Sequence, residues 1–323
     1  MISCTSPLHC FTIGYDKDGK PIKEITSSAF TEYKGSYKFQ EVPCGRCLAC
    51  RLARSRDWAN RCMLELQYHD DAHFLTLTYD DDHIPKEEWI TSDGEVVETA
   101  VLVKRDLQLF LKRLRKKFPQ ANIRYYACGE YGSQTMRPHY HMILYGLHLD
   151  DLKFYKNTKL GYNLYNSETL DRVWKNGYVV VGAVSWDTCA YTARYIVKKR
   201  LGPDAATWYK QHHLEPEFVI MSLKPAIGRR YYDDNVNTIF DSNYMYLPTD
   251  DGCRQITPPL YFRRLKQESD SEFFTTRSEL SRNSARTKRR LMKKDSHMDY
   301  LEQLRVQDEN LKAKTKALAR KEI

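Results

Sequence analysis

Long apolar runs are absent from this chain of 323 residues: no stretch approaches the roughly 18 apolar residues of a transmembrane helix. Its first residues also lack the basic-then-apolar pattern of a secretory signal peptide. We therefore expect a soluble, intracellular protein that does not enter a membrane. In a reducing compartment, its nine cysteines should be free thiols or metal ligands rather than disulfides.

A phosphate-binding loop of the form GxxxxGK[ST] is also missing, which argues against a fused ATP-driven helicase. Positive charge, by contrast, is plentiful: 51 Lys and Arg against 42 Asp and Glu give a formal net charge of +9. Residues 263–323 hold 17 of these basic and 10 of these acidic residues, and so account for +7 of the total. This tail indicates a polyanionic partner, although a solvated charged helix would explain the charge equally well.

Two histidines stand on one predicted strand, within residues 137–146. Side chains alternate between the faces of a strand, so His139 and His141 project from the same face. Residues 124–132 read as a second strand that enters a turn, and a hairpin would bring Glu130 beside the histidines. Two imidazoles and one carboxylate with open positions suit Mg²⁺ or Mn²⁺ on a phosphate oxygen, although the same set also takes zinc or iron.

Residues 191–200 predict a helix in which Tyr191, Tyr195 and Lys198 share one stripe. A phenol is a competent nucleophile toward phosphorus once a metal has withdrawn charge from the phosphate. A nearby cation then stabilises the phenolate or the leaving oxygen. The reaction that this set of residues would serve is phosphoryl transfer to tyrosine.

Three motifs occur here in a specific order: the strand at 74–80, the His139-Tyr140-His141 motif, and the helix with Tyr191, Tyr195 and Lys198. In this order they resemble the three motifs of HUH endonucleases, the rolling-circle replication initiators. The nearest resemblance is to the initiators of gokushovirus-type microviruses, which are small single-stranded DNA phages. The Pro-Cys-Gly-x-Cys-x-x-Cys segment of that group is present at 43–50.

The resemblance implies an α+β protein with the HUH endonuclease fold, in which helices cover a central antiparallel sheet and strand 74–80 lies beside the His-bearing strand. It also implies an enzyme that nicks origin DNA, leaving a 5′-phosphotyrosyl link and a free 3′-OH, and later rejoins the strands. His139, His141 and Glu130 would hold the Mg²⁺ or Mn²⁺ ion. The implied partners are single-stranded or origin DNA and the host polymerase and helicase, in the cytoplasm of a bacterial host cell.

Tyr195 is our first choice of nucleophile because Lys198 follows it three residues later, as in single-tyrosine relatives. Arg194 holds the corresponding place after Tyr191. Two other functions stay open: a non-enzymatic nucleic-acid-binding protein with a zinc-stapled N-terminus, and a transposase or relaxase of the same superfamily. Relaxases usually place the tyrosine before the histidines, which counts against the last option.

Three cysteines, Cys44, Cys47 and Cys50, are closely spaced around a glycine that permits a tight turn. Close-set thiolates of this kind can wrap one Zn²⁺ ion, and Cys4 or Cys10 would supply a fourth ligand. Because structural zinc sites usually show two separated pairs, free thiols explain the pattern equally well.

The pattern of apolar residues predicts further elements. Helices are expected at 48–69, 104–118 and 168–174, a buried strand at 178–184, and a loop or small hairpin at 85–101. We divide the chain into a Cys-rich N-terminal segment at 1–65, an endonuclease core at 66–200, an extension at 201–262 with possible DNA contacts, and a basic tail at 263–323 that is helical or disordered.

Overall fold

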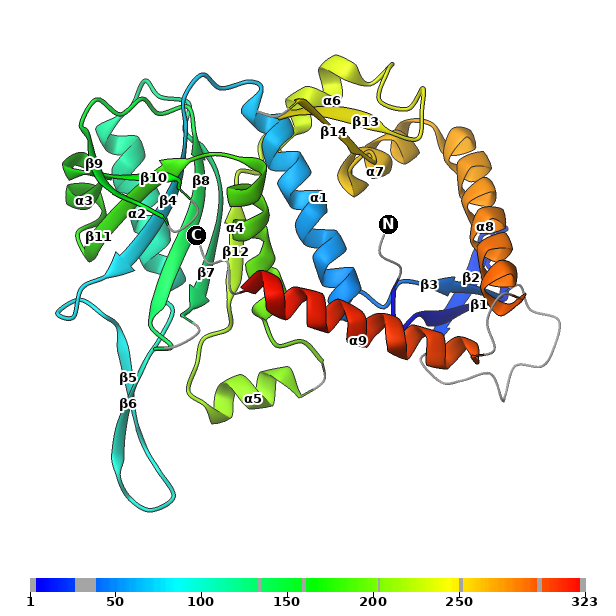
Figure 1. Ribbon diagram of the computed structural model, residues 1–323, viewed down its shortest axis with the longest axis horizontal. Coiled ribbons are helices and arrows are strands. Elements are labelled where there is room, and N and C mark those ends of the chain that lie inside the picture. The colour runs from blue at the N-terminus through cyan, green and yellow to red at the C-terminus, as the bar shows by residue number, and fades with distance from the viewer. Residues whose placement is uncertain are drawn as a thin grey trace. The chain divides into compact units, whose positions relative to one another are not determined.

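The computed structural model describes residues 4–26, 39–132, 135–158, 161–202, 204–249, 252–294 and 298–319. The chain forms two compact units (Figure 1). Residues 54–262 make up one, which we call the sheet unit, and residues 1–53 with 263–321 make up the other, which we call the terminal unit. Among the described residues, no helix combines the length and apolar character needed to cross a membrane.

A seven-stranded sheet forms the centre of the sheet unit, in the order β12-β7-β8-β4-β11-β10-β9. Every neighbouring pair is antiparallel. The strands are β4 (Ala72–Tyr79), β7 (Arg124–Tyr131), β8 (Pro138–Tyr145), β9 (Leu152–Asn157), β10 (Asn163–Ser167), β11 (Gly177–Ala183) and β12 (Phe218–Met221). The expected α+β class and the expected pairing of β4 with the His-bearing strand β8 are confirmed.

Helices cover both faces of this sheet (Figure 1). One face packs against α2 (Lys104–Lys117) and α3 (Glu168–Trp174), and the other against α1 (Leu48–Leu66) and α4 (Trp186–Lys198). Along β8, Tyr140 and Met142 enter the core on the α2 side, whereas Ile143 and Tyr145 enter the core on the α4 side. The alternation therefore puts the odd-numbered histidines of β8 on the face that α4 covers.

Helix α2 confirms the clearest helical prediction. Its buried residues are Leu107, Phe110, Leu111 and Leu114, which recur at helical spacing. Arg113 lies between this apolar stripe and the solvent, where its guanidinium donates hydrogen bonds to the carbonyl oxygens of Val173 (2.7 Å) and Trp174 (2.8 Å). Arg113 therefore joins α2 to the end of α3 rather than contributing to a basic face.

Strands β9 and β10 were not predicted from the sequence, which read residues 147–167 as a polar connection. They form one edge of the sheet, and every residue of β9 after Leu152 is exposed. An edge strand open to solvent on both faces has no alternation of apolar and polar residues to reveal it. Their hydrogen bonds to β11 decide their structure.

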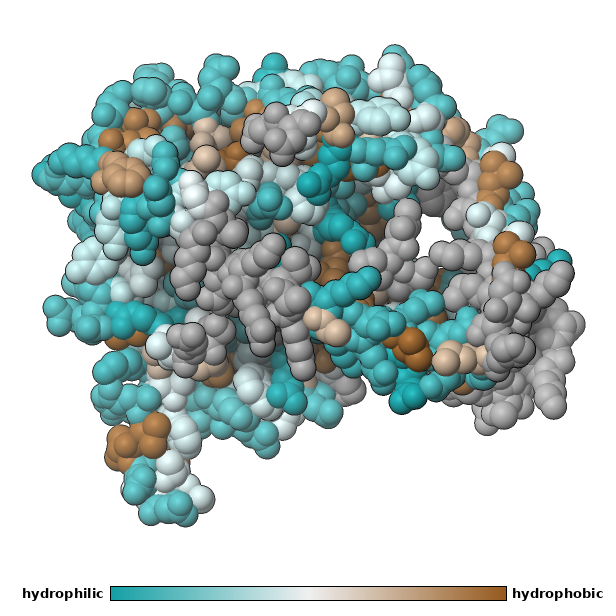
Figure 2. Space-filling view, in the orientation of Figure 1, coloured by the Kyte–Doolittle hydropathy of each residue, from teal (hydrophilic) through white to brown (hydrophobic). Residues whose placement is uncertain are grey.

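The rest of the sheet unit consists of short elements, and the predicted hairpin is present as β5 (Lys86–Ile90) paired with β6 (Val96–Ala100). Its surface carries a hydrophobic patch (Figure 2), where Ile90 and Val96 pair across the hairpin, 70% and 67% exposed. The other elements are α5 (Ala205–Gln211), α6 (Arg229–Asn235), α7 (Leu260–Ser269), β13 (Met245–Thr249) and β14 (Gly252–Ile256).

The terminal unit combines both ends of the chain. A three-stranded sheet of order β2-β1-β3 contains β1 (Leu8–Tyr15), β2 (Pro21–Thr26) and β3 (Phe39–Val42). The basic tail folds as α8 (Ser271–Lys294) and α9 (Tyr300–Ala319), so its described part is helical. In α9, Leu304 is buried and Tyr300 donates a hydrogen bond to a carboxylate oxygen of Glu41, at 3.0 Å.

Candidate metal centre and tyrosine pocket

The hairpin of β7 and β8 brings the three predicted metal ligands together. Its register places Glu130 opposite His139. The Nε2 atom of His139 lies 2.7 Å from Oε1 of Glu130, and the Nε2 atom of His141 lies 3.4 Å from the same oxygen. One ligand atom from each of the three residues lies within 4.8 Å of the other two. Local strand pairing is thus sufficient to assemble the cluster.

The remaining ring nitrogens have partners that orient both histidines. Nδ1 of His139 lies 3.1 Å from the carbonyl oxygen of Arg137, and because a carbonyl oxygen only accepts, this nitrogen carries the proton. Nδ1 of His141 lies 3.1 Å from Oγ1 of Thr76, the residue opposite it on β4. Both Nε2 atoms therefore face Glu130, and contacts of this kind fix the ring orientation of metal-ligating histidines.

Glu130 is almost fully buried, with 1% of its surface exposed. Burial alone would raise the pKa of its carboxyl, but hydrogen bonds with His139 and His141 outweigh burial and lower the pKa to about 2. The group is therefore a carboxylate at neutral pH. A buried carboxylate beside two oriented imidazoles fits a divalent cation that keeps open coordination positions.

A pocket of about 330 Å³ opens beside this cluster. Phe74 stacks parallel on the His141 ring, with centroids 5.6 Å apart, and Tyr191 meets the same ring edge-on at 5.1 Å. The remaining lining is mostly polar. The lining residues are Phe74, Thr76, Thr78, Gly132, Thr135, Arg137, His139, His141 and Tyr191.

Helix α4 supplies the predicted tyrosines. Because α4 packs on the face of the sheet that carries the histidines, it places the Tyr191 ring in the pocket. Tyr195 and Lys198 belong to the last turns of α4, and their side chains lie outside the part of the chain that the structure describes. The structure thus brings Tyr191 together with the metal ligands, while the roles of Tyr195 and Lys198 stay predictions.

Three pocket residues were not singled out from the sequence. Phe74 and Thr76 lie on β4, where their same-face alternation with Thr78 was visible, but only the pairing with β8 sets Thr76 opposite His141. Arg137 lines the pocket as a partly exposed cation. Its guanidinium donates to the carbonyl oxygen of Tyr79 and pairs with Asp81, both at 2.7 Å.

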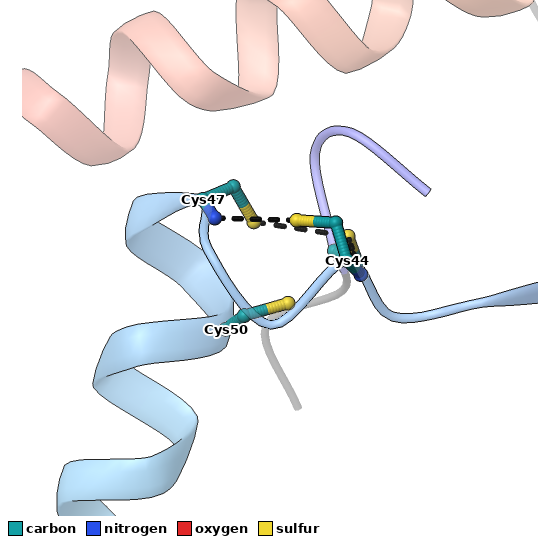
Figure 3. Close-up of side chains that lie close together, drawn as sticks. Cys44, Cys47 and Cys50 are labelled. Atoms are coloured by element: carbon teal, nitrogen blue, oxygen red, sulfur yellow. Dashed lines mark hydrogen bonds between the residues drawn. The ribbon is translucent and has the colours of Figure 1, made fainter. Parts of the chain in front are cut away.

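A second cluster lies in the terminal unit, where the sulfurs of Cys4, Cys44, Cys47 and Cys50 approach one another within 4.8 Å. Figure 3 shows Cys44 and Cys47 pointing toward each other, with Cys50 extending from the first turn of α1 toward the same space. The structure places Cys4 in this group; Cys10, the other predicted candidate, lies buried in β1.

Comparison with known proteins places the pocket inside a recognised segment. Residues 72–200 match the family model for replication-associated proteins of the ORF2 type, a segment that contains every residue lining the pocket. The chain is also similar to replication-associated protein ORF2 of Spiroplasma virus 4, with 33% identity over 314 residues that cover 93% of each chain.

Two further relatives have similar identity over shorter regions. Replication-associated protein VP4 of Bdellovibrio phage phiMH2K is 32% identical over 253 residues, which cover 75% of this chain and 72% of that one. Replication-associated protein ORF4 of Chlamydia phage 1 is 32% identical over 189 residues, covering 55% and 44%. No solved structure matches the chain.

Proposed function

Because the chain belongs to the family of phage replication-associated proteins that includes ORF2 of Spiroplasma virus 4, we propose that it initiates rolling-circle replication by nicking origin DNA with a tyrosine of α4. The observation that carries the proposal is the shared pocket: the Tyr191 ring contacts His141, one of three clustered metal ligands. The antiparallel sheet with helices on both faces supports the HUH fold for this chain.

His139, His141 and Glu130 would hold one Mg²⁺ or Mn²⁺ ion, which supplies charge withdrawal from the scissile phosphate. Arg137 provides a fixed positive charge that attracts the DNA phosphate to the pocket. The tyrosine oxygen forms a bond to phosphorus while the bond to the 3′ oxygen breaks. This leaves a 5′-phosphotyrosyl link and a free 3′-OH that a host polymerase extends, with unwinding by a host helicase.

The phosphoester is exchanged rather than hydrolysed, so the reverse reaction rejoins the strand without ATP. Two tyrosines one helical turn apart allow one to open the circle and the other to cut the new copy. Tyr195 is proposed as the first nucleophile because Lys198 follows it, and Tyr191 as the second. Lys198 would stabilise the phenolate or the leaving oxygen.

The proposal is tested with purified full-length protein and labelled single-stranded oligonucleotides that tile its own genome, with Mn²⁺ or with chelator. Denaturing gels report cleavage, and mass spectrometry locates any DNA adduct. We expect a Mn²⁺-dependent adduct on Tyr195 or Tyr191, lost in the variant with both Tyr195→Phe and Tyr191→Phe. The control Tyr178→Phe, on exposed β11, should keep full activity.

The two single variants rank the tyrosines. Full nicking by Tyr195→Phe, together with loss in Tyr191→Phe, would reverse the proposed order. DNA binding without any adduct across all oligonucleotides would replace the endonuclease with a non-enzymatic nucleic-acid-binding protein.

A further inference from the structure

The four clustered cysteines of the terminal unit have the spacing of a metal tetrahedron. A tetrahedral site with zinc–sulfur bonds of about 2.3 Å has sulfur–sulfur edges of about 3.8 Å. The sulfurs of Cys4 and Cys47 lie 3.7 Å apart. This separation is far longer than a disulfide bond of about 2.05 Å, so the pair is arranged for a shared ligand rather than for a covalent bond.

Backbone amides around the cluster point at the sulfur atoms. The N–H groups of Arg46 and Cys47 donate to the sulfur of Cys44, with donor–sulfur distances of 3.4 and 3.2 Å. The N–H group of Cys44 donates to the sulfur of Cys4 at 3.4 Å. Gly45 makes this turn possible because its φ of 73° lies in the left-handed region that favours glycine. Amide donors stabilise thiolates, the form in which cysteine binds a metal.

Residues next to the cluster hold the C-terminal helix of the same unit. Thr5, which follows Cys4, donates a hydrogen bond of 2.7 Å to Asp308 of α9. Glu41, which precedes Cys44 by three residues, accepts a hydrogen bond of 3.0 Å from Tyr300 at the start of α9. Any ion that fixes the four cysteines therefore also fixes two anchors of α9.

We propose that Cys4, Cys44, Cys47 and Cys50 bind one structural Zn²⁺ ion, which fastens the N-terminal residues to the first turn of α1 and holds α9 in place. Four thiolates in a tetrahedron with no open position are the ligand set of structural zinc sites. This inference is independent of the proposed nicking activity, because it concerns a different cluster of residues in the terminal unit.

The test measures metal content in full-length protein carrying His139→Ala and His141→Ala, so that only the cysteine cluster can hold a metal tightly. Elemental analysis should find one zinc ion per chain. Replacement by Co²⁺ should give the visible absorption of a tetrahedral thiolate complex. Adding Cys4→Ser should remove the zinc, whereas Cys10→Ser and the exposed control Cys253→Ser should retain it.

Hydrogen exchange provides a second measurement that does not depend on a folded variant. Removing zinc with chelator should increase amide exchange in residues 300–319, and returning zinc should reverse the increase. Zinc-free native protein, iron in place of zinc, zinc lost with Cys10→Ser but kept with Cys4→Ser, or a disulfide between Cys4 and Cys47 would each overturn the proposal. Unchanged exchange in α9 would overturn its holding role.

Discussion

Thr76→Val is the substitution that most sharply tests how the histidine cluster is built. The two side chains have nearly the same shape, and valine suits a strand at least as well as threonine. The change removes the hydroxyl that lies 3.1 Å from Nδ1 of His141. Since only 5% of the His141 side chain is exposed, water cannot easily replace that hydroxyl.

The expected magnitude follows from the role of such contacts in metal sites. Losing a partner that orients a metal-ligating histidine lowers metal affinity by about 10- to 100-fold. This range corresponds to about 1.4–2.8 kcal/mol, close to the penalty of about 1–3 kcal/mol for leaving a buried polar group unsatisfied. The affinity should fall without loss of the fold, because no core apolar group is removed.

Calorimetric titration of Mn²⁺ into the Thr76→Val protein measures this affinity directly, and the Mn²⁺ dependence of nicking measures it through activity. We expect the half-saturating Mn²⁺ concentration to rise by about 10- to 100-fold, with a near-normal rate at saturation. Thr78→Val is the matched control, since Thr78 lines the same pocket on the same strand face but the His141 contact belongs to Thr76. Unchanged affinity in Thr76→Val, or an equal loss in both variants, would refute the proposed orientation of His141.

Two other substitutions test the sheet unit by urea unfolding. Glu65 pairs with buried Arg124; burial would raise its pKa, but hydrogen bonds with His69 and Arg124 lower it from 4.5 to about 2, worth about 3 kcal/mol. Glu65→Gln should lose that stability at pH 7, and its deficit should shrink as the pH falls from 4.5 toward 2; a constant deficit would disprove the linkage. Gly177→Ala should cost about 3 kcal/mol, because φ is 142° and a Cβ atom would lie 2.4 Å from backbone atoms of β4 and the residue after it, whereas Gly182→Ala on the same strand should cost little.

Local sequence patterns determined much of this protein. The alternation along residues 138–145 set His139 and His141 on one face, and the short turn before them made Glu130 a neighbour, because hairpin pairing is local. The stripe of Leu107, Phe110 and Leu114 likewise defined α2. The order of the motifs also indicated gokushovirus-type replication initiators, and the relatives confirm that resemblance.

Tertiary structure decided the contacts between distant segments. The choice of Cys4 over Cys10 depends on how the N-terminal residues fold back over the turn at Cys44, and neither spacing nor residue type distinguishes the two thiols. Thr76 became the partner of His141 only through the register of β4 with β8, two strands 65 residues apart at this contact. Periodicity reports which face of an element is buried, but which elements meet there is settled by packing among all of them.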